Sequence, residues 1–451
     1  MKSIKEFLYS ATQGLFNVPA RAFNVGLMLF AGMSTNTQAQ NLSEQEHFLL
    51  NNIQNRQAEQ VELLEKLVNI NSGTENKKGV EEVGQILAKA FTEINFKAHW
   101  VHLPDSMKHA GTLILEHHPT NYHGKKILLI GHLDTVFPPN HAFQKFKREN
   151  DTAYGPGVAD IKGGDLVILY ALKSLYDKKL LEHAYITVVL TGDEENSALP
   201  HSISRKALID AAEDIDVALE FEMASPDNKV IIGRRGMIKW ALETVGVEKH
   251  SSLIFDKNTG DGAVFELTRN LSKLLEFCKK HKGLTANTAL IASGTKLENN
   301  FANHSAQVLS TLNIIPKRAV AEGEIRFISE AQCLQAKAFM QKTAQETLPP
   351  TKAHVTFKEP TPAMPATQNN QSLLRQYSFL SQKIGKGEVS AYDPIKRGAS
   401  DISYVANKVP YNLAGLGAIG SGAHTEEEQI SISGLTTNTQ RAALLIHQLT
   451  R

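Results

Sequence analysis

Five short segments of this sequence place histidine and carboxylate side chains where they could bind a metal ion. The first, residues 131–136 (GHLDTV), follows an apolar run typical of a buried strand. Side chains alternate along an extended chain, so His132 and Asp134 point the same way at the strand end. We predict that His132 binds the metal while the Asp134 carboxylate fixes the tautomer of its imidazole. A polar turn is the competing interpretation.

The second segment, residues 155–164 (GPGVADIKGG), carries the single carboxylate Asp160 in a glycine-dense loop. Glycine permits backbone conformations that can turn this carboxylate inward. A phosphate-binding loop is the alternative, but the segment lacks the GK[ST] ending of a P-loop and the GxGxxG spacing of a dinucleotide-binding fold. The segment therefore favours an inward-facing carboxylate, a candidate metal ligand, over a phosphate-binding loop.

The third segment, residues 191–196 (TGDEEN), holds three consecutive acids after another apolar run. Like charges in one turn repel one another, and a bound cation would relieve that repulsion. Adjacent side chains cannot share one direction. We predict that Glu195 is a ligand and that Glu194 faces the attacking water as general base. A solvated acidic turn is the alternative.

The last two segments are residues 216–222 (DVALEFE) and residues 420–426 (GSGAHTE). In an extended strand Glu220 and Glu222 share one face, which suits either a ligand or a half-exposed sheet edge. His424 lies in a glycine-containing loop after an apolar segment. The other histidines lack such a setting and are interpreted as structural or exposed; they include His117, His118, His123, His201 and His304.

The elements that must position these segments alternate between helices and strands. Ser43 and Glu46 have the spacing of a capping box. Helical patterns cover residues 48–67, 80–94, 165–176, 373–384 and 438–449, and strand patterns cover residues 97–103, 112–116, 127–131 and 186–190. This alternation predicts an α/β sheet flanked by helices. A separate α+β group is predicted from strands at 240–247, 306–314 and 319–327 and helices at 262–280 and 330–347.

Taken in this order and spacing, the five segments resemble the M20 family of metallopeptidases, especially its glutamate carboxypeptidase branch, over residues 49–449. The resemblance implies a zinc-peptidase-like mixed sheet and two zinc ions, with cobalt or manganese as alternatives. It implies that Asp160 bridges the ions. His132 and Glu222 would bind one ion, and Glu195 and His424 the other. Glu222 is preferred to Glu220 because it stands six residues after Asp216, as the ligand does in that branch.

The resemblance also covers residues 237–359, which would be an inserted lid and dimerisation domain between two parts of the catalytic domain, residues 40–236 and 360–451. It implies a homodimer in which His250 reaches across to polarise the substrate carbonyl. Asn313 and Arg326 would hold the carboxylate end of the substrate, since a guanidinium matches a carboxylate bidentately. Residues 398–401 (GASD) resemble the substrate-side loop of the family.

One departure from the branch concerns Thr361, which stands where an arginine is expected and leaves the side-chain preference open. The function implied is hydrolysis of the C-terminal amide bond of a small peptide or N-acyl amino acid by metal-activated water, with Glu194 as base. An N-acyl amino-acid deacylase or a dipeptidase would use the same residues. A non-catalytic dimeric binding protein is the alternative from another class.

Composition and the N-terminal residues indicate which partners and which cellular location to expect. The 451 residues are 42% apolar and 21% charged, and 48 Lys and Arg balance 47 Asp and Glu, so neither nucleic acid nor an anionic membrane is an expected partner. Residues 1–39 resemble a signal peptide that ends at Ala39, without the length to span a membrane stably. We expect a periplasmic or secreted protein; a cytoplasmic one is the alternative. In an exported chain Cys278 and Cys333 could form a disulfide or remain thiols.

Overall fold

The computed structural model describes residues 42–451, so the predicted signal peptide, residues 1–39, lies outside the described residues. Within residues 42–451 no helix combines the length and the apolar character that crossing a membrane requires.

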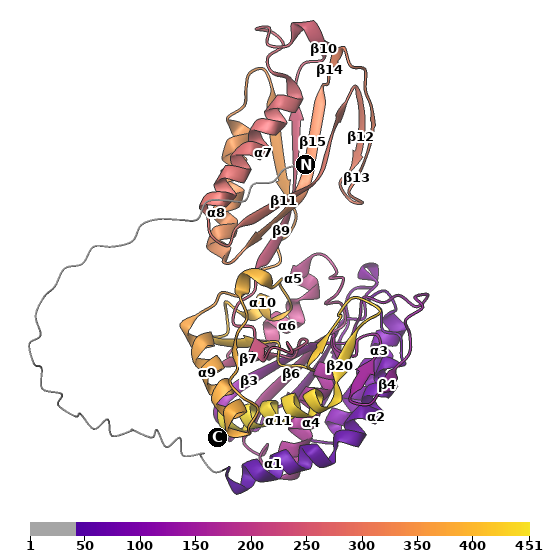
Figure 1. Cartoon of the computed structure of the whole chain (residues 1–451), viewed down its shortest axis with the longest axis vertical. Coiled ribbons are helices and arrows are strands. Elements are labelled where there is room, and N and C mark those ends of the chain that lie inside the picture. Colours follow the sequence, from indigo (N-terminus) through magenta and orange to yellow (C-terminus); the bar gives the residue numbers. More distant parts are fainter. Residues whose placement is uncertain (1–41) are drawn as a thin grey trace, which may run out of the picture. The chain divides into compact units, whose positions relative to one another are not determined.

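A six-stranded mixed sheet forms the centre of the part that lies outside residues 237–359 (Figure 1). Its strands lie in the order β1 (Lys97–Val101), β2 (Thr112–His117), β6 (Ala184–Thr191), β3 (His123–His132), β7 (Val217–Glu220) and β18 (Tyr411–Ala414). Strand β3 runs parallel to β6 and β7, and β18 runs parallel to β7. Strand β2 runs antiparallel to β6, and β1 runs antiparallel to β2. The carboxyl ends of β3, β6 and β7 therefore meet at one edge. This mixed sheet confirms the predicted fold class.

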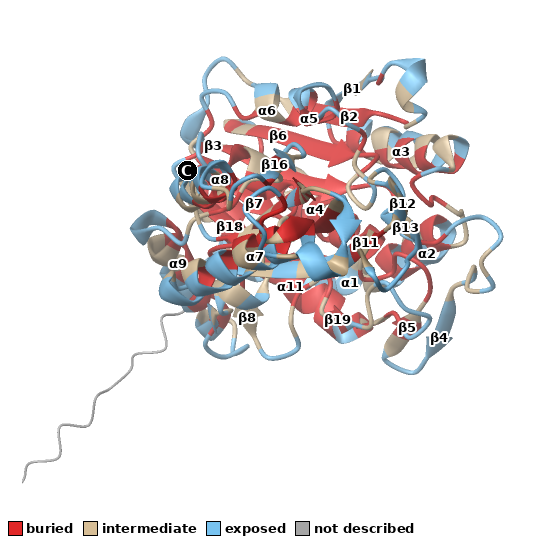
Figure 2. Cartoon of the chain, turned by 90° about the horizontal axis from the view of Figure 1, so that it is seen from above, coloured by how far each residue is buried: buried red, intermediate tan, exposed pale blue. Residues whose placement is uncertain are grey.

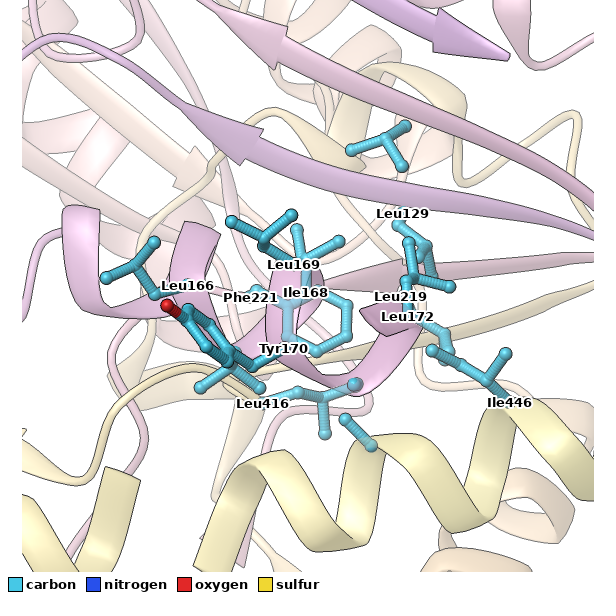
Figure 3. Packing of buried hydrophobic residues seen from close by; sticks show 14 of the residues in the cluster. Leu129, Leu166, Ile168, Leu169, Tyr170, Leu172, Leu219, Phe221, Leu416 and Ile446 are labelled. Carbon is cyan, nitrogen blue, oxygen red and sulfur yellow. The ribbon is translucent and has the colours of Figure 1, made fainter. Parts of the chain in front are cut away.

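Helices cover both faces of the sheet. The main core packs against α1 (Glu44–Asn55), α2 (Gln57–Val68), α3 (Lys77–Thr92), α4 (Lys162–Asp177), α9 (Gln368–Lys383) and α11 (Ile432–Leu449). Figure 3 shows side chains of α4 packed between Leu129 and Leu219 of the sheet and Ile446 of α11. A smaller core on the other face involves α6 (Lys206–Ala211), which follows the short helix α5 (His201–Ser204), and α10 (Ile402–Val405). With both faces covered, the central strands are largely buried (Figure 2).

A small antiparallel sheet joins two of the predicted site loops. Its order is β19 (Gly420–Ser421), β20 (Gln429–Ser431), β5 (Thr152–Tyr154) and β4 (Lys147–Glu149). Gln429 at the start of β20 pairs with Tyr154 at the end of β5. The loop after β5 carries Asp160 and the loop before β20 carries His424, so this pairing brings both loops to the same end of the small sheet. A two-residue parallel pair links β8 (Lys229–Val230) and β17 (Ser390–Ala391).

The inserted segment has a core and a sheet of its own. Its elements are β9 (Gly236–Val245), β10 (Lys249–His250), α7 (Gly262–Lys280), β11 (Thr285–Gly294), β12 (Lys296–Asn300), β13 (Ser305–Leu309), β14 (Ile314–Ile315), β15 (Arg318–Phe327), α8 (Glu330–Gln345) and β16 (Lys352–Phe357). The antiparallel order β11-β15-β9-β16 packs against α7 and α8. Cys278 and Cys333 are buried in this core as free thiols, not as a disulfide.

Three local predictions need correction. The helix expected over residues 48–67 is divided at Arg56 into α1 and α2, although the capping box of Ser43 and Glu46 is present as predicted. The strand expected over residues 306–314 is divided into β13 and β14. Strand β7 ends at Glu220, so Glu222 lies beyond it, and β7 pairs on both sides instead of forming a half-exposed edge.

Candidate metal centre

The structure brings six side chains together at the carboxyl edge of the central sheet and the neighbouring loops. They are His132 at the end of β3, Asp160 before α4, Glu194 and Glu195 after β6, Glu222 after β7, and His424 between β19 and β20. These are the six residues predicted from the sequence as ligands or base. Their ligand and base roles stay predictions.

The Asp160 carboxylate lies between the two imidazoles. Its Oδ1 is 3.2 Å from His132 Nε2, and its Oδ2 is 3.2 Å from His424 Nε2. Burial alone would raise the pKa of Asp160, but the hydrogen bonds with His132 and His424 outweigh it and lower that pKa. A carboxylate that presents one oxygen to each of two histidines is arranged to be shared between two cations.

Each histidine has a second carboxylate beside it. His132 Nε2 is 3.7 Å from Glu222 Oε1, and His424 Nε2 is 3.0 Å from Glu195 Oε2. The arrangement therefore divides into a group of His132, Asp160 and Glu222 and a group of Asp160, Glu195 and His424. These are the two groups that the family resemblance implies for two metal ions, and metal binding by them stays a prediction.

The donor set fits a divalent metal. Ligand atoms of His132, Asp160 and Glu195 lie within 4.8 Å of one another, as do those of His132, Glu194 and Glu222. Glu195 Oε1 is buried without a hydrogen-bond partner among the described residues. Such an orphaned carboxylate oxygen costs free energy unless a cation or donor compensates it. Imidazole nitrogen and carboxylate oxygen are ligands that zinc accepts.

Glu194 occupies a setting suited to proton transfer. Burial, followed by the negative charge of Glu222, raises its pKa well above the usual range of a glutamate. A carboxyl group with a raised pKa can take up and return a proton near neutral pH. Its backbone N–H donates to Asp134 Oδ1 at 3.0 Å, and this hydrogen bond fixes the position of the Glu194 backbone.

Asp134 supports His132 from the side away from Asp160. Its Oδ1 is 3.3 Å from His132 Nδ1, and its carbonyl oxygen is 3.1 Å from the same nitrogen. With Nδ1–H directed at Asp134, the lone pair of Nε2 faces Asp160. Asp134 Oδ2 accepts hydrogen bonds from the Thr74 hydroxyl at 2.6 Å and from the Glu195 N–H at 3.1 Å.

Glu220 is committed to other partners. Its carboxylate accepts hydrogen bonds from Arg234 Nη2 at 2.9 Å, from the Ser400 hydroxyl at 2.7 Å and from the Ile402 N–H at 2.8 Å. The side chain is 2% exposed. The sequence pattern alone left Glu220 and Glu222 open as candidates, and these contacts favour Glu222 because only its carboxylate faces His132.

Among the buried charged residues that were not predicted, Glu428 and Arg205 lie next to the site. Glu428 accepts the N–H groups of Gly157, Ala159 and Asp160 at 2.8 to 2.9 Å and so fixes the Asp160 loop. Burial raises the pKa of Glu428 to about 7. In the sequence this residue stands in the run EEE at 426–428 and resembles a surface acid. No local pattern distinguishes it.

Arg205 is the second unpredicted residue, and it is fully buried. Its guanidinium is 2.6 Å from Asp193 Oδ1 and 2.8 Å from Asp401 Oδ1. The first of the three consecutive acids is therefore neutralised by an arginine. Arg205 is thus one cation that relieves the repulsion in the acidic run, beside the metal that the sequence predicts. Asp401, in the GASD segment, also accepts a hydrogen bond from the Thr191 hydroxyl.

The three predicted substrate-binding residues belong to the insert. His250 is exposed in β10, and its Nδ1 lies 2.8 Å from the Ser252 hydroxyl. The Asn313 carbonyl accepts the Ser251 N–H at 2.8 Å, so Asn313 lies next to the His250 segment. Arg326 in β15 pairs with Glu324 at 2.8 Å. Among residues 42–451, no hydrogen bond or ion pair joins these three side chains to the six of the metal centre.

Comparison with known proteins gives a consistent result. Residues 128–448 match the model of peptidase family M20/M25/M40. Carboxypeptidase G2 of Pseudomonas sp. (strain RS-16) is 27% identical over 396 residues, which cover 86% of this chain and 89% of that protein.

Solved structures share the fold. Aminopeptidase PepT from Bacillus cereus ATCC 10987 aligns with a TM-score of 0.68 at 19% identity, covering 88% of this chain and 99% of that chain. The Bacillus subtilis YXEP protein, a dinuclear metal binding peptidase from the M20 family, aligns with a TM-score of 0.59 at 14% identity and the same coverage. The family match spans more than half of the sequence and confirms the resemblance. The chain is a metallopeptidase-type enzyme that belongs to peptidase family M20/M25/M40.

Proposed function

We propose that this enzyme is a zinc-dependent hydrolase that cleaves the C-terminal amide bond of a small peptide or N-acyl amino acid, in the manner of a carboxypeptidase. The observation that carries the proposal is the position of Asp160, shared between His132 and His424, with the half-buried Glu194 carboxyl close to His132 and Glu222. The similarity to carboxypeptidase G2 over most of both chains supports the direction of cleavage.

His132, Asp160 and Glu222 would hold one zinc ion, and Asp160, Glu195 and His424 the other. Bound zinc supplies Lewis acidity, which lowers the pKa of water from about 15.7 to about 7 and polarises a carbonyl group. Cobalt or manganese would suit the same donor set.

Glu194 acts as the general base in this proposal. It accepts a proton from the attacking water and returns it to the nitrogen of the leaving amino acid, so one carboxyl group serves both halves of the reaction. Its raised pKa favours this exchange because the protonated form is accessible near neutral pH. Asp134 acts through the backbone of Glu194 and the ring of His132, and it is a positioning residue.

Arg326 is proposed to bind the substrate carboxylate, together with Asn313. Its guanidinium is about one third exposed and pairs with Glu324, so a substrate carboxylate could bind the same guanidinium beside Glu324. His250, exposed on the insert, is proposed to polarise the substrate carbonyl across a homodimer formed through the lid domain. From the pattern of residues 1–39 we propose that the enzyme works in the periplasm or outside the cell.

A substrate panel tests the proposal. The zinc-loaded enzyme is assayed on N-blocked dipeptides, on the same dipeptides with a C-terminal amide, on N-acyl amino acids and on free dipeptides. We expect the blocked dipeptides with a free carboxylate to be cleaved with the highest kcat/KM. Arg326→Ala should abolish the preference for the free carboxylate over the amide.

Two outcomes would overturn the assignment. Hydrolysis of acyl amino acids without cleavage of blocked dipeptides would make the enzyme a deacylase. A requirement for a free amino terminus would make it a dipeptidase. Independently of the substrate, full activity after exhaustive removal of metal would exclude the proposed zinc dependence.

A further inference from the structure

Glu194 lies in an irregular turn, residues 193–198, between strand β6 and helix α5. No helix or strand hydrogen bonds hold residues 193–198, so other groups have to fix the direction of the Glu194 side chain. Asp134 does this for the N–H groups of Glu194 and Glu195. The remaining contacts of the turn lead to one buried guanidinium.

Arg205, between α5 and α6, contacts the turn on both sides of Glu194. Its Nη1 donates to Asp193 Oδ1 at 2.6 Å, and its Nη2 donates to the Asp193 carbonyl oxygen at 2.9 Å. Nη2 also donates to the Ser197 hydroxyl at 2.7 Å, and this hydroxyl donates to the Glu194 carbonyl oxygen at 3.3 Å. One guanidinium therefore holds the residue before Glu194 directly and the Glu194 backbone through a single hydroxyl group.

The guanidinium of Arg205 is itself anchored to the central sheet. Its Nε lies 2.8 Å from Asp401 Oδ1, and Asp401 accepts a hydrogen bond from the hydroxyl of Thr191, the last residue of β6. The side chains of Arg205 and Asp193 are both fully buried. A planar guanidinium presents several donors in a fixed geometry, which an ammonium group does not. The turn is thus tied to the end of β6 by a rigid connector.

We propose that Arg205 is a positioning residue for the hydrolytic reaction, because it fixes the direction in which Glu194 faces the attacking water. The inference rests on the proposed role of Glu194 as general base. Among residues 42–451, the hydrogen bonds and ion pairs of the Arg205 side chain reach Asp193, Ser197 and Asp401, and none reaches a proposed metal ligand. A change at Arg205 should therefore act on kcat and not on the zinc ions.

Arg205→Lys tests the inference while keeping a buried positive charge. On the substrate of the panel that the enzyme cleaves fastest, kcat at saturating zinc should fall about 10–100-fold, since a small misplacement of a catalytic group has an effect of that size. KM should stay within about threefold, because the substrate-binding residues are unchanged. Arg441→Lys is the matched control and should keep the wild-type kcat. Arg441 is also buried, and its hydrogen bonds go to Asn438, Asn228 and the Lys386 carbonyl.

A second variant tests the same connection without changing a buried charge. Ser197→Ala removes the link between Arg205 and the Glu194 carbonyl but leaves the contacts with Asp193. We expect kcat to fall about 3–10-fold with unchanged zinc content, since part of the positioning remains. Ser202→Ala, at an exposed serine of α5, is its control and should match the wild type.

Wild-type kcat in both Arg205→Lys and Ser197→Ala, with Glu194→Gln inactive, would overturn this inference and leave the proposed base in place. An equal loss of kcat in Arg441→Lys would also overturn it, because general destabilisation would then explain the effect. So would a loss in Arg205→Lys that occurs only at limiting zinc, since Arg205 would then act through the metal ligands. Full activity of Glu194→Gln would instead remove the proposed base and this inference with it.

Discussion

Asp134 holds Glu194 by its backbone, with Asp134 Oδ1 accepting the Glu194 N–H at 3.0 Å. The same buried carboxylate accepts the Glu195 N–H at 3.1 Å and lies 3.3 Å from His132 Nδ1. One side chain therefore fixes the proposed base and two proposed ligands relative to one another. A displacement of Asp134 would therefore disturb metal binding and proton transfer together.

Replacing Asp134 by asparagine should weaken zinc binding about 10–100-fold and lower kcat. Asparagine offers one acceptor oxygen where aspartate offers two. Its NH₂ group would therefore face a backbone N–H, of Glu194 or Glu195, that donates to a carboxylate oxygen in the wild type. Zinc affinity is measured by competition with a chelator, and kcat at saturating zinc. Asp105→Asn, at an exposed acid, is the control and should behave as wild type. Unchanged zinc affinity in Asp134→Asn would remove Asp134 from its positioning role.

Glu194→Gln should retain zinc and lose activity by about 10²–10⁴-fold, because the amide cannot accept the proton. Glu195→Gln should instead lose zinc, since its carboxylate lies 3.0 Å from His424 Nε2. Elemental analysis and kcat/KM measured on both variants separate the two roles. Zinc loss in Glu194→Gln equal to that in Glu195→Gln would identify Glu194 as a ligand, as its proximity to His132 and Glu222 also allows.

Much of the fold could be predicted because its long elements have strong periodic patterns. Helix α7 begins at Gly262 and ends at Lys280 as predicted, and β3 and β6 contain the predicted apolar runs. Strands β11 and β16 were not predicted. Strand β11 (TANTALIASG) lies at an edge of its sheet and is largely exposed or half-buried, so it has no buried apolar run to reveal it.

At the site, residue type and order were predictable from the residues, whereas the choice of Glu222 over Glu220 came from the family resemblance and not from the local pattern. Glu220 and Glu222 have the same local pattern, and the partners that occupy Glu220 stand 14 to 182 residues away. Glu428 contacts backbone groups 268 to 271 residues away. Long-range hydrogen bonds of this kind leave no mark on the local sequence, because an acid at a buried position and an acid at the surface are the same residue type.

Glu220→Gln should destabilise the fold by about 3–5 kcal/mol, since it leaves the buried Arg234 guanidinium without its charged partner. Glu222→Gln should cost less stability and lose zinc. The free energy of unfolding is measured in urea on metal-free protein, and zinc content on the reloaded protein. The reverse pattern, with zinc lost only in Glu220→Gln, would exchange the roles of the two acids.

The contribution of His447 to stability should fall as the pH drops below 6.5. Burial, followed by the positive charge of Arg451, lowers the pKa of His447 below its ordinary value of 6.5. Between its lowered folded pKa and 6.5, His447 binds more protons in the unfolded chain, so its contribution to stability is complete above pH 6.5 and decreases as the pH falls through that window. The difference in free energy of unfolding between metal-free wild type and His447→Leu, taken at pH 7.5 and at pH 5.5, measures this contribution.

His447→Leu should lose less stability than the wild type over that interval, because leucine cannot be protonated. The exposed His47→Leu is the control and should follow the wild type. An identical pH dependence in His447→Leu and wild type would show that His447 does not contribute.

Glu428→Gln should weaken zinc binding without removing any proposed ligand. The carboxylate accepts three backbone N–H groups of the Asp160 loop, and Glu428 stands four residues after His424 in the other loop. One side chain thus couples the loops of Asp160 and His424. A glutamine retains a single acceptor oxygen, and its NH₂ group would face N–H donors, so the Asp160 loop has to move.

The exposed neighbour Glu427 provides the matched control, because Glu427→Gln makes the same chemical change in the same loop. We expect about 10–100-fold weaker zinc binding in Glu428→Gln and wild-type binding in Glu427→Gln, measured by chelator competition. High zinc should restore most of the kcat of Glu428→Gln, since Glu194 and the ligands are intact. If the two variants bound zinc equally, the coupling of the loops through Glu428 would have no part in forming the metal centre.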